Sequence, residues 1–152
     1  RIQHAGVILG IGGIAGHAQK YFADTEPGRL PIFNSKDVIR NYSAVTAACF
    51  MINKEKFFEV GGLDERFTIA FNDVDFCLKL RNKGYYNLYT PYAKLFHYES
   101  TSAGKPGSEH RDMKQFRREI ELMHKKWGKV LQNDPFYNKN LSLTREDFSL
   151  RI

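Results

Sequence analysis

The fold class is decided by residues 53–89, which read NKEKFFEVGGLDERFTIAFNDVDFCLKLRNKGYYNLY. Lys54 to Val60 predict a short helix, because the Gly61-Gly62 pair that follows readily takes the left-handed conformation in which helices end. Leu63 to Phe71 predict an extended loop. The stretch therefore opens with a helix, a glycine turn and a loop.

A second helix begins at Asn72, which we predict to be its N-cap. Asp75 would then occupy the third helical position, where a carboxylate reaches back to free amides. Residues at helical spacing follow, namely Val74, Cys77, Leu78 and Arg81, and Gly84 ends the helix. Tyr85 to Tyr89 alternate as a strand. Because helices and strands are mixed along the chain, the pattern favours an α/β fold.

Upstream, a β-branched run from Gln3 to Ile11 predicts a strand that ends in glycines. The segment GIGGIAGHA, Gly10 to Ala18, matches the dinucleotide pattern G-x-G-x-x-A, but no helix and further strand complete that unit. We therefore expect these glycines to let the backbone pass close to a neighbouring strand or a ligand. Ser43 to Ile52 predict another strand, with small residues in its first half.

Downstream, Ala93 to Phe96 predict a short strand that runs into His97. A long helix is predicted from Glu109 to about Leu131. Its apolar residues recur at three- and four-residue steps, at Met113, Phe116, Ile120, Met123, Trp127 and Leu131. The tail from Asn133 onward is predicted to be irregular.

The chain carries a formal charge of +6. Much of the basic excess lies in the long helix, at Lys114, Arg117, Arg118, Lys125 and Lys126. Such a patch is either an ordinary solvated helix face or a surface for anionic lipid, phosphate or nucleic acid. No nucleic-acid motif is present and the aromatic residues fall at core spacing, so we expect no nucleic-acid partner. No apolar run approaches the roughly 20 residues that cross a bilayer.

Cys49 and Cys77 lie in apolar segments and show no metal-binding spacing. We expect buried, reduced thiols and hence a cytoplasmic protein.

The chain begins at Arg1 in what reads as a strand, so we also expect a piece of a longer protein. Surfaces exposed by such a truncation, above all the apolar stripe of the long helix, are expected to favour a homodimer.

Three ordered motifs carry a resemblance to a known family. They are Gly61-Gly62-Leu63-Asp64-Glu65, Asn72-Asp73-Val74-Asp75-Phe76 and Pro91-Tyr92-Ala93-Lys94-Leu95-Phe96-His97. Together with the opening QHAGVILG and the tail, they make nearly the whole chain resemble the acceptor-side half of the inverting family 2 glycosyltransferases of bacterial polysaccharide assembly. The resemblance implies a partial GT-A domain with a mixed sheet and flanking helices. Residues 1–108 would be its acceptor-side half, and 109–152 a C-terminal helix and tail packed on the same domain.

The resemblance also implies roles for single residues. Asp73 matches the family's general base, which takes the proton of the acceptor hydroxyl as that hydroxyl attacks the anomeric carbon. Asn72, Asp75, Ala47 and Gly62 match positions of acceptor binding or site support. For Asp73 and Asp75 the alternative is an ordinary helix-start carboxylate. Asn72 stands where relatives usually have Glu, which leaves the acceptor preference open.

The resemblance also implies a metal site, to which a residue further along the sequence than the acidic motif contributes. His97 matches a histidine that completes the metal site in some relatives, and a satisfied histidine at a strand end is the alternative. Mg or Mn is expected in the full-length enzyme, where it neutralises the departing diphosphate. The carboxylates of the Asp-x-Asp metal motif would lie before Arg1. We therefore expect the fragment to hold no metal firmly and to be inactive alone.

The implied function is transfer of a hexosyl or deoxyhexosyl group from a nucleotide-sugar donor to a glycan or lipid-linked acceptor in cell-surface polysaccharide synthesis. The protein would be cytoplasmic, with peripheral contact at the inner face of the cell membrane through its basic helix. His4 and His17 flank the glycine loop, and the role expected for them is limited to donor contact. The alternative function is a non-catalytic carbohydrate-binding or assembly module derived from the same fold.

Overall fold

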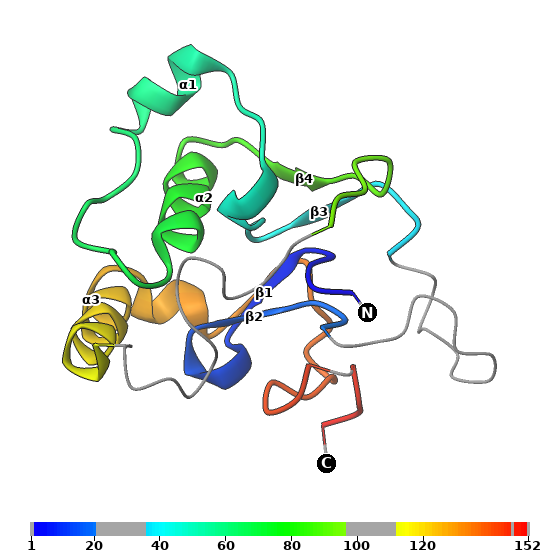
Figure 1. Ribbon diagram of the computed structural model, residues 1–152. Coiled ribbons are helices and arrows are strands. Elements are labelled where there is room, and N and C mark those ends of the chain that lie inside the picture. Colours follow the sequence, from blue (N-terminus) through cyan, green and yellow to red (C-terminus); the bar gives the residue numbers. More distant parts are fainter. Residues whose placement is uncertain (1, 21–35, 97–111, 147, 152) are drawn as a thin grey trace.

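The computed structural model of the chain describes residues 2–20, 36–96, 112–146 and 148–151. Within these ranges the protein is a mixed α/β structure with two small antiparallel sheets and three α-helices (Figure 1). Strand β1 pairs with β2 and β3 pairs with β4. An isolated bridge between Val7 and Ala44 links the two pairs. The described residues therefore form two short ladders where the resemblance implied one mixed sheet.

The N-terminal segment is a β-hairpin. β1 spans Val7–Leu9 and β2 spans Ala15–His17, and the 3₁₀ turn η1, Ile11–Gly13, joins them. Gly10 takes a positive φ of 84°, a value that favours glycine. The strand is shorter than the predicted Gln3–Ile11. The close approach expected of these glycines is made at Gly10 to the end of α3, since a Cβ there would lie 2.9 Å from the Leu131 carbonyl oxygen, and not to a neighbouring strand.

The second pair joins distant parts of the chain. β3, Arg40–Tyr42, pairs with β4, Asn87–Tyr89. The strand predicted over Ser43–Ile52 is wrong, because the chain leaves the sheet and forms the 3₁₀ turn η3, Ala47–Cys49. The hydroxyl of Thr46 accepts a hydrogen bond from a backbone N–H of this turn. Local side-chain bonds of this kind compete with strand pairing.

The two helices in the middle of the chain follow their predicted positions. α1 spans Lys54–Glu59 and α2 spans Asn72–Asn82. Gly61 and Gly84 follow them with φ values of 76° and 85°, as the glycine signals predicted. The predicted cap of α2 is displaced by one residue, because Phe71 is the N-cap and Asn72 is the first helical residue.

The long helix α3 spans Met113–Leu131. Asp112 caps it, since its carboxylate accepts hydrogen bonds from two backbone N–H groups of the first turn, both at 3.0 Å. The start predicted at Glu109 lies outside the described residues. The inner part of the apolar stripe is buried, at Met123, Trp127 and Leu131. The outer end is not, because Met113 is 53% exposed.

One apolar core joins the hairpin to α2 and α3, with Leu9, Leu78 and Trp127 among its buried members. Figure 1 shows α2 between α1 and α3. None of the helices in the described ranges has the length and apolar character needed to cross a membrane.

Two segments near the ends of the chain complete the fold. Ala93–Phe96 form no strand, and the Phe96 side chain is 92% exposed, so this prediction is wrong. Within the described ranges no strand pairs with this segment, and an isolated short strand is not stable by itself. The described tail is irregular, as predicted, apart from an isolated bridge between Leu141 and Leu150.

Candidate functional site

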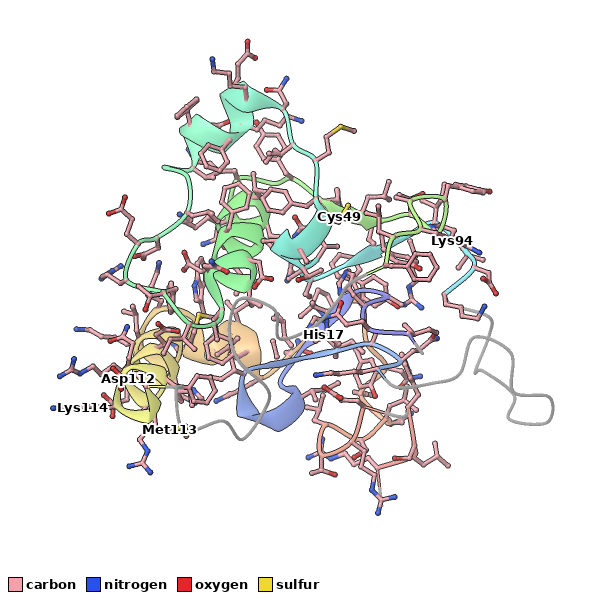
Figure 2. The ribbon with its side chains drawn as sticks, viewed as in Figure 1. His17, Cys49, Lys94, Asp112, Met113 and Lys114 are labelled. Carbon is pink, nitrogen blue, oxygen red and sulfur yellow. The ribbon has the colours of Figure 1, made fainter. Side chains whose placement is uncertain are left out.

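A pocket of about 230 Å³ lies between the N-terminal hairpin and the start of α2. It is lined by Val7 and 15–17 on one side and by 69–74 on the other. His17, on β2, marks the hairpin wall in Figure 2. A hollow of about 450 Å³ elsewhere is lined only by the end of α3 and the residue after it, so it brings no separate segments together. The smaller pocket is therefore the stronger candidate site.

Asp73 lines this pocket from the first turn of α2. Its Oδ2 accepts a hydrogen bond from the backbone N–H of Ala47 at 3.0 Å. Its Oδ1 accepts one from the N–H of Val74 at 2.9 Å. The structure thus brings Asp73 and Ala47 together, and the carboxylate ties η3 to the start of α2.

Asn72 also lines the pocket, one residue before Asp73. Its Oδ1 accepts a hydrogen bond from the Asp73 backbone N–H at 2.8 Å. Phe71, the residue before, holds a φ of 65°, which is uncommon for a side chain of its size. Its ring stacks on Phe116 of α3, with centroids 5.8 Å apart. This contact with α3 supports the backbone turn that presents Asn72 and Asp73.

Glu119 of α3 holds the loop that leads into the pocket. Its buried carboxylate accepts hydrogen bonds from the backbone N–H groups of Thr68 at 2.7 Å, Ile69 at 3.0 Å and Ala70 at 2.8 Å. Burial alone would raise the pKa of this carboxyl, but the bonds donated by Gln115 and by these three amides outweigh it and lower the pKa. Sequence reasoning missed Glu119, because a lone Glu in a helix carries no signal of burial.

Asp75 is fully buried and faces α3. Its Oδ1 accepts a hydrogen bond from Trp127 Nε1 at 2.7 Å and forms an ion pair with Lys126. Lys79 lies 3.7 Å from Oδ2. The prediction that its carboxylate caps the helix is wrong. α3 provides a charged and hydrogen-bonding partner, and a buried carboxylate requires one.

Gly62 lies away from the pocket. It is buried after α1, with φ 63°, and its carbonyl oxygen accepts a hydrogen bond from Lys79 Nζ. A Cβ at this position would lie 3.0 Å from the Phe57 ring. Gly62 therefore supports the packing of α1 against α2, and the structure does not bring it to Asp73.

His97 lies outside the described residues, so its surroundings stay a prediction. Among the described residues, no group of three or more His, Cys, Asp or Glu side chains is arranged to hold a metal. Asp73 and Asp75 form an Asp-x-Asp pair in sequence, but their carboxylates have separate partners, on η3 and on α3.

The two histidines for which we expected no role beyond donor contact meet beside the pocket. His4 Nδ1 lies 3.1 Å from His17 Nδ1, with the rings at right angles. His4 Nε2 accepts hydrogen bonds from the backbone N–H groups of Gly6 at 3.3 Å and Thr46 at 3.5 Å. Burial and the neighbouring His17 lower the pKa of His4 from 6.5 to about 3. Their positions on either side of the glycine loop were the only signal in the sequence.

The cysteines differ from the expectation that both are buried. Cys77 is buried and its Sγ lies 3.5 Å from the backbone nitrogen of Val45. Burial, with a further contribution from Asp73, raises the pKa of this thiol to about 12. Cys49, on η3, is exposed.

Comparison with known proteins shows similarity along nearly the whole chain. An uncharacterized protein y4gI of Sinorhizobium fredii (strain NBRC 101917 / NGR234) is 46% identical over 151 residues, which are 99% of this chain and 16% of that protein. The O-antigen biosynthesis protein RfbC of Myxococcus xanthus is 33% identical over 152 residues, which are 11% of its own length.

A shorter similarity carries a more specific name. The N-acetylglucosaminyl-diphospho-decaprenol L-rhamnosyltransferase of Mycobacterium tuberculosis is 30% identical over 66 residues, which are 43% of this chain and 22% of that enzyme. The chain thus spans less than a quarter of each of these relatives. No protein-family model matches the sequence, and no solved structure matches it significantly. The named relatives suggest a glycosyltransferase-like family.

Proposed function

We propose that this chain is the acceptor-side part of a GT-A-type domain in an inverting glycosyltransferase. The whole protein would transfer a hexosyl or deoxyhexosyl group from a nucleotide-sugar donor to a glycan or lipid-linked acceptor in polysaccharide synthesis. The observation that carries the proposal is the position of Asp73 on the wall of a pocket, at the first turn of α2. The names of two relatives, for O-antigen biosynthesis and for L-rhamnosyl transfer, support it.

Asp73 is placed for general-base chemistry. Asp73 stands in the first turn of α2, and the helix dipole favours a negative charge at that position. Each carboxylate oxygen accepts one backbone hydrogen bond and keeps a second lone-pair direction. In the proposed step the acceptor O–H bond breaks and its proton moves to Asp73. The oxygen bonds to the anomeric carbon as the bond to the diphosphate oxygen breaks, and the nucleoside diphosphate leaves with the electron pair.

Three supporting roles belong to the same proposal. Ala47 orients the Asp73 carboxylate through its N–H, Asn72 contributes its side chain to the pocket, and Asp75 anchors α2 to α3. Gly62 acts further away, through the packing of α1 on α2.

Mg or Mn belongs to the whole protein in this proposal, bound by carboxylates outside this chain with His97 as a further ligand. The described residues do not fit such an ion, because the Asp73 and Asp75 carboxylates have separate partners. Each step assigned here to Asp73 therefore stands without the ion.

The proposal also includes contact between the basic face of α3 and a membrane. The basic residues of α3, namely Lys114, Arg117, Arg118 and Lys125, are all exposed. Figure 2 shows Lys114 at the outer end of α3. We place this face against the anionic inner surface of the cell membrane, with the protein on the cytoplasmic side. Unchanged sedimentation with phosphatidylserine vesicles after charge reversal at the four positions would remove this placement.

The decisive experiment replaces Asp73 by Asn in the longer protein that contains this chain. We expect turnover, measured as nucleoside diphosphate release from a panel of nucleotide sugars, to fall about 10²–10⁴-fold, the usual contribution of general-base catalysis. Asp112→Asn is the matched control. Asp112 is also a helix-start carboxylate with two backbone hydrogen bonds, but it lies outside the pocket. The Asp112→Asn variant should retain full turnover.

Two outcomes would redirect the proposal. If Asp73→Asn turns over as fast as the unmodified protein, Asp73 is not the base. If the unmodified protein binds glycans and never releases nucleoside diphosphate, the alternative of a non-catalytic carbohydrate-binding module replaces the enzyme. The replacement of the usual Glu by Asn72 is the observation that favours this alternative.

A further inference from the structure

Asn87 is a polar side chain buried where the second pair of strands meets α2. It is the first residue of β4 and lies opposite Tyr42 of β3. Asparagine is depleted in strands, and burying an amide without hydrogen-bond partners is costly. Its Nδ2 donates hydrogen bonds to the backbone carbonyls of Ser43 at 2.9 Å and Cys77 at 3.2 Å. These bonds offset the cost, and they join β4 to two other parts of the chain.

The orientation of this amide follows from its two partners. A carbonyl oxygen only accepts hydrogen bonds, so the group of Asn87 that faces both carbonyls is the NH₂ and not Oδ1. The NH₂ group has one hydrogen for each carbonyl. One side chain therefore sets how the segment after β3 is placed against the middle of α2.

The segment that Asn87 holds, residues 43–47, runs along α2 in regular steps (Figure 1). Three hydrogen bonds tie it to the helix: from Arg81 Nη1 to the Ser43 hydroxyl at 3.0 Å, from the Val45 N–H to Cys77 Sγ at 3.5 Å, and from the Ala47 N–H to Asp73 Oδ2 at 3.0 Å. Two residues of extended chain cover about 6.6 Å. Four residues of helix cover about 6 Å, so the spacings match and the position of residue 43 determines that of residue 47.

The last of these three contacts is the one that orients Asp73. Its Oδ1 accepts the Val74 N–H, which belongs to the same helix and is in place whenever α2 is formed. Its Oδ2 accepts the N–H of Ala47, the first residue of η3, which is in place only when the segment lies in register on α2. The orientation of the carboxylate in the pocket therefore depends on that register.

We propose that Asn87 is a positioning residue for Asp73, because its amide sets the register of residues 43–47 on α2 and so presents the Ala47 N–H to the carboxylate. This inference rests on the proposed function, since Asp73 is taken to be the general base. Asn87 is not among the residues that line the pocket, so it acts only through Ala47. Its loss should lower kcat and leave KM nearly unchanged, because the pocket walls stay and the orientation of the base does not.

Amide exchange in this chain tests the register without activity or ligand. We expect the Ala47 amide to be protected in the unmodified chain and to exchange about tenfold faster in Asn87→Ala, as the loss of one hydrogen bond predicts. Asn87→Thr keeps a similar volume and favours a strand, carries no donor at the Nδ2 position, and should accelerate exchange equally if Asn87→Ala does not fold. An unprotected Ala47 amide in the unmodified chain overturns the inference before any variant is made.

Tyr89→Phe is the matched control for these exchange rates. Tyr89 lies on the same strand, and its hydroxyl also donates to a backbone carbonyl, that of Lys36. Its removal costs a hydrogen bond of the same kind without touching α2, so exchange at Ala47 should stay within about threefold. Equal acceleration in Tyr89→Phe and in the Asn87 variants would show general loosening of the fold and would contradict the positioning role.

Turnover of the longer protein tests whether Asn87 acts through Ala47. Ala47→Pro removes only the N–H that Asp73 accepts. The fold should tolerate it, because Thr46 before it is extended, with φ −72° and ψ 142°, and the first position of a helical turn accepts proline. We expect Asn87→Ala and Ala47→Pro each to lower kcat about tenfold with KM within about threefold. The double variant should be no slower than Ala47→Pro alone, because both changes remove the same contact.

Three results would sink the inference: a double variant about a hundredfold slower than the unmodified protein, full turnover in Ala47→Pro, or a raised KM with unchanged kcat in Asn87→Ala. The proposed function fails separately, when Asp73→Asn keeps its turnover. If Asp73 is required for turnover but Asn87→Ala and Asn87→Thr turn over normally, only the inference about Asn87 falls.

Discussion

Two acidic side chains in one short motif have opposite surroundings. Asp73 lines the pocket and accepts hydrogen bonds from backbone amides, whereas Asp75 is fully buried against α3. Residues two apart on a helix point about 200° apart, so the two carboxylates could not share a face. The charge of Asp75 is balanced by Lys126, which also pairs with Asp64.

The first prediction concerns this buried pair. Lys126→Met should lower the free energy of unfolding by about 2 kcal/mol, because Asp75 would stay buried with Trp127 and the more distant Lys79 as its remaining partners among the described residues. Its Oδ2 already accepts no hydrogen bond within the described part of the chain. Urea unfolding measures the change. Lys125→Met, on the exposed face, is the control and should stay within about 0.5 kcal/mol. Equal stability of the two variants would contradict the ion-pair role.

At the scale of elements, α3 determines the shape of the pocket although it does not line it. Glu119 fixes the backbone of Ile69 and Ala70, and Phe116 stacks on Phe71. A side chain held at the φ of Phe71 costs of order 1–3 kcal/mol, so the surroundings must enforce it. The contacts from α3 do this. The helix therefore belongs to the same folding unit as the pocket.

The second prediction follows from this dependence. Glu119→Gln should lower the free energy of unfolding by about 2 kcal/mol, since the amide nitrogen of Gln cannot accept the N–H groups that the carboxylate accepts. Amide exchange at Ile69 and Ala70 should accelerate more than exchange in α2. Glu121→Gln, an exposed change two residues along the same helix, is the control for charge and helix propensity. If the exchange rates at both loop amides stay unchanged, Glu119 does not hold the loop.

For the whole molecule, the hairpin and its histidine pair predict how stability depends on pH. The folded protein keeps His4 neutral because its pKa is lowered to about 3, whereas the unfolded chain binds a proton near 6.5. The unfolded state then holds more protons between these values, so stability falls as pH falls from 6.5 to about 3. The slope from this one group is at most about 1.4 kcal/mol per pH unit.

The third prediction isolates this contribution. Between pH 6.5 and about 5.5 the carboxyls of Asp64 and Glu119, whose pKa values are lowered, add little, because their ordinary values of 3.8 and 4.5 leave the unfolded forms largely ionised about one unit higher. His4→Gln should therefore flatten the pH dependence of urea unfolding in this window, while His124→Gln, on the exposed face of α3, should not. An unchanged slope in His4→Gln would show that His4 binds a proton equally well in the folded protein and in the unfolded chain, and it would contradict the prediction.

Local signals predicted α1, α2, β4 and the body of α3, because glycine turns, caps and helical periodicity act within a few residues. The predicted strands were wrong where pairing with distant parts of the chain decides whether a strand forms. Ser43 accepts a hydrogen bond from Arg81 and donates one to Asp134, contacts that draw its segment away from a ladder. Of the predicted site residues, the structure brings Asn72, Asp73 and Ala47 together, places Asp75 and Gly62 elsewhere, and leaves His97 outside the described residues.

What the sequence determined by itself was therefore the order of the elements and the acidic start of α2, since both depend on residues close together along the chain. Tertiary structure alone decided which carboxylate faces the pocket, which is buried, and which histidines meet. Those outcomes require side chains more than ten residues apart to compete for burial and hydrogen bonds. The residues next to a side chain in sequence do not determine whether that side chain is buried or which partner it contacts.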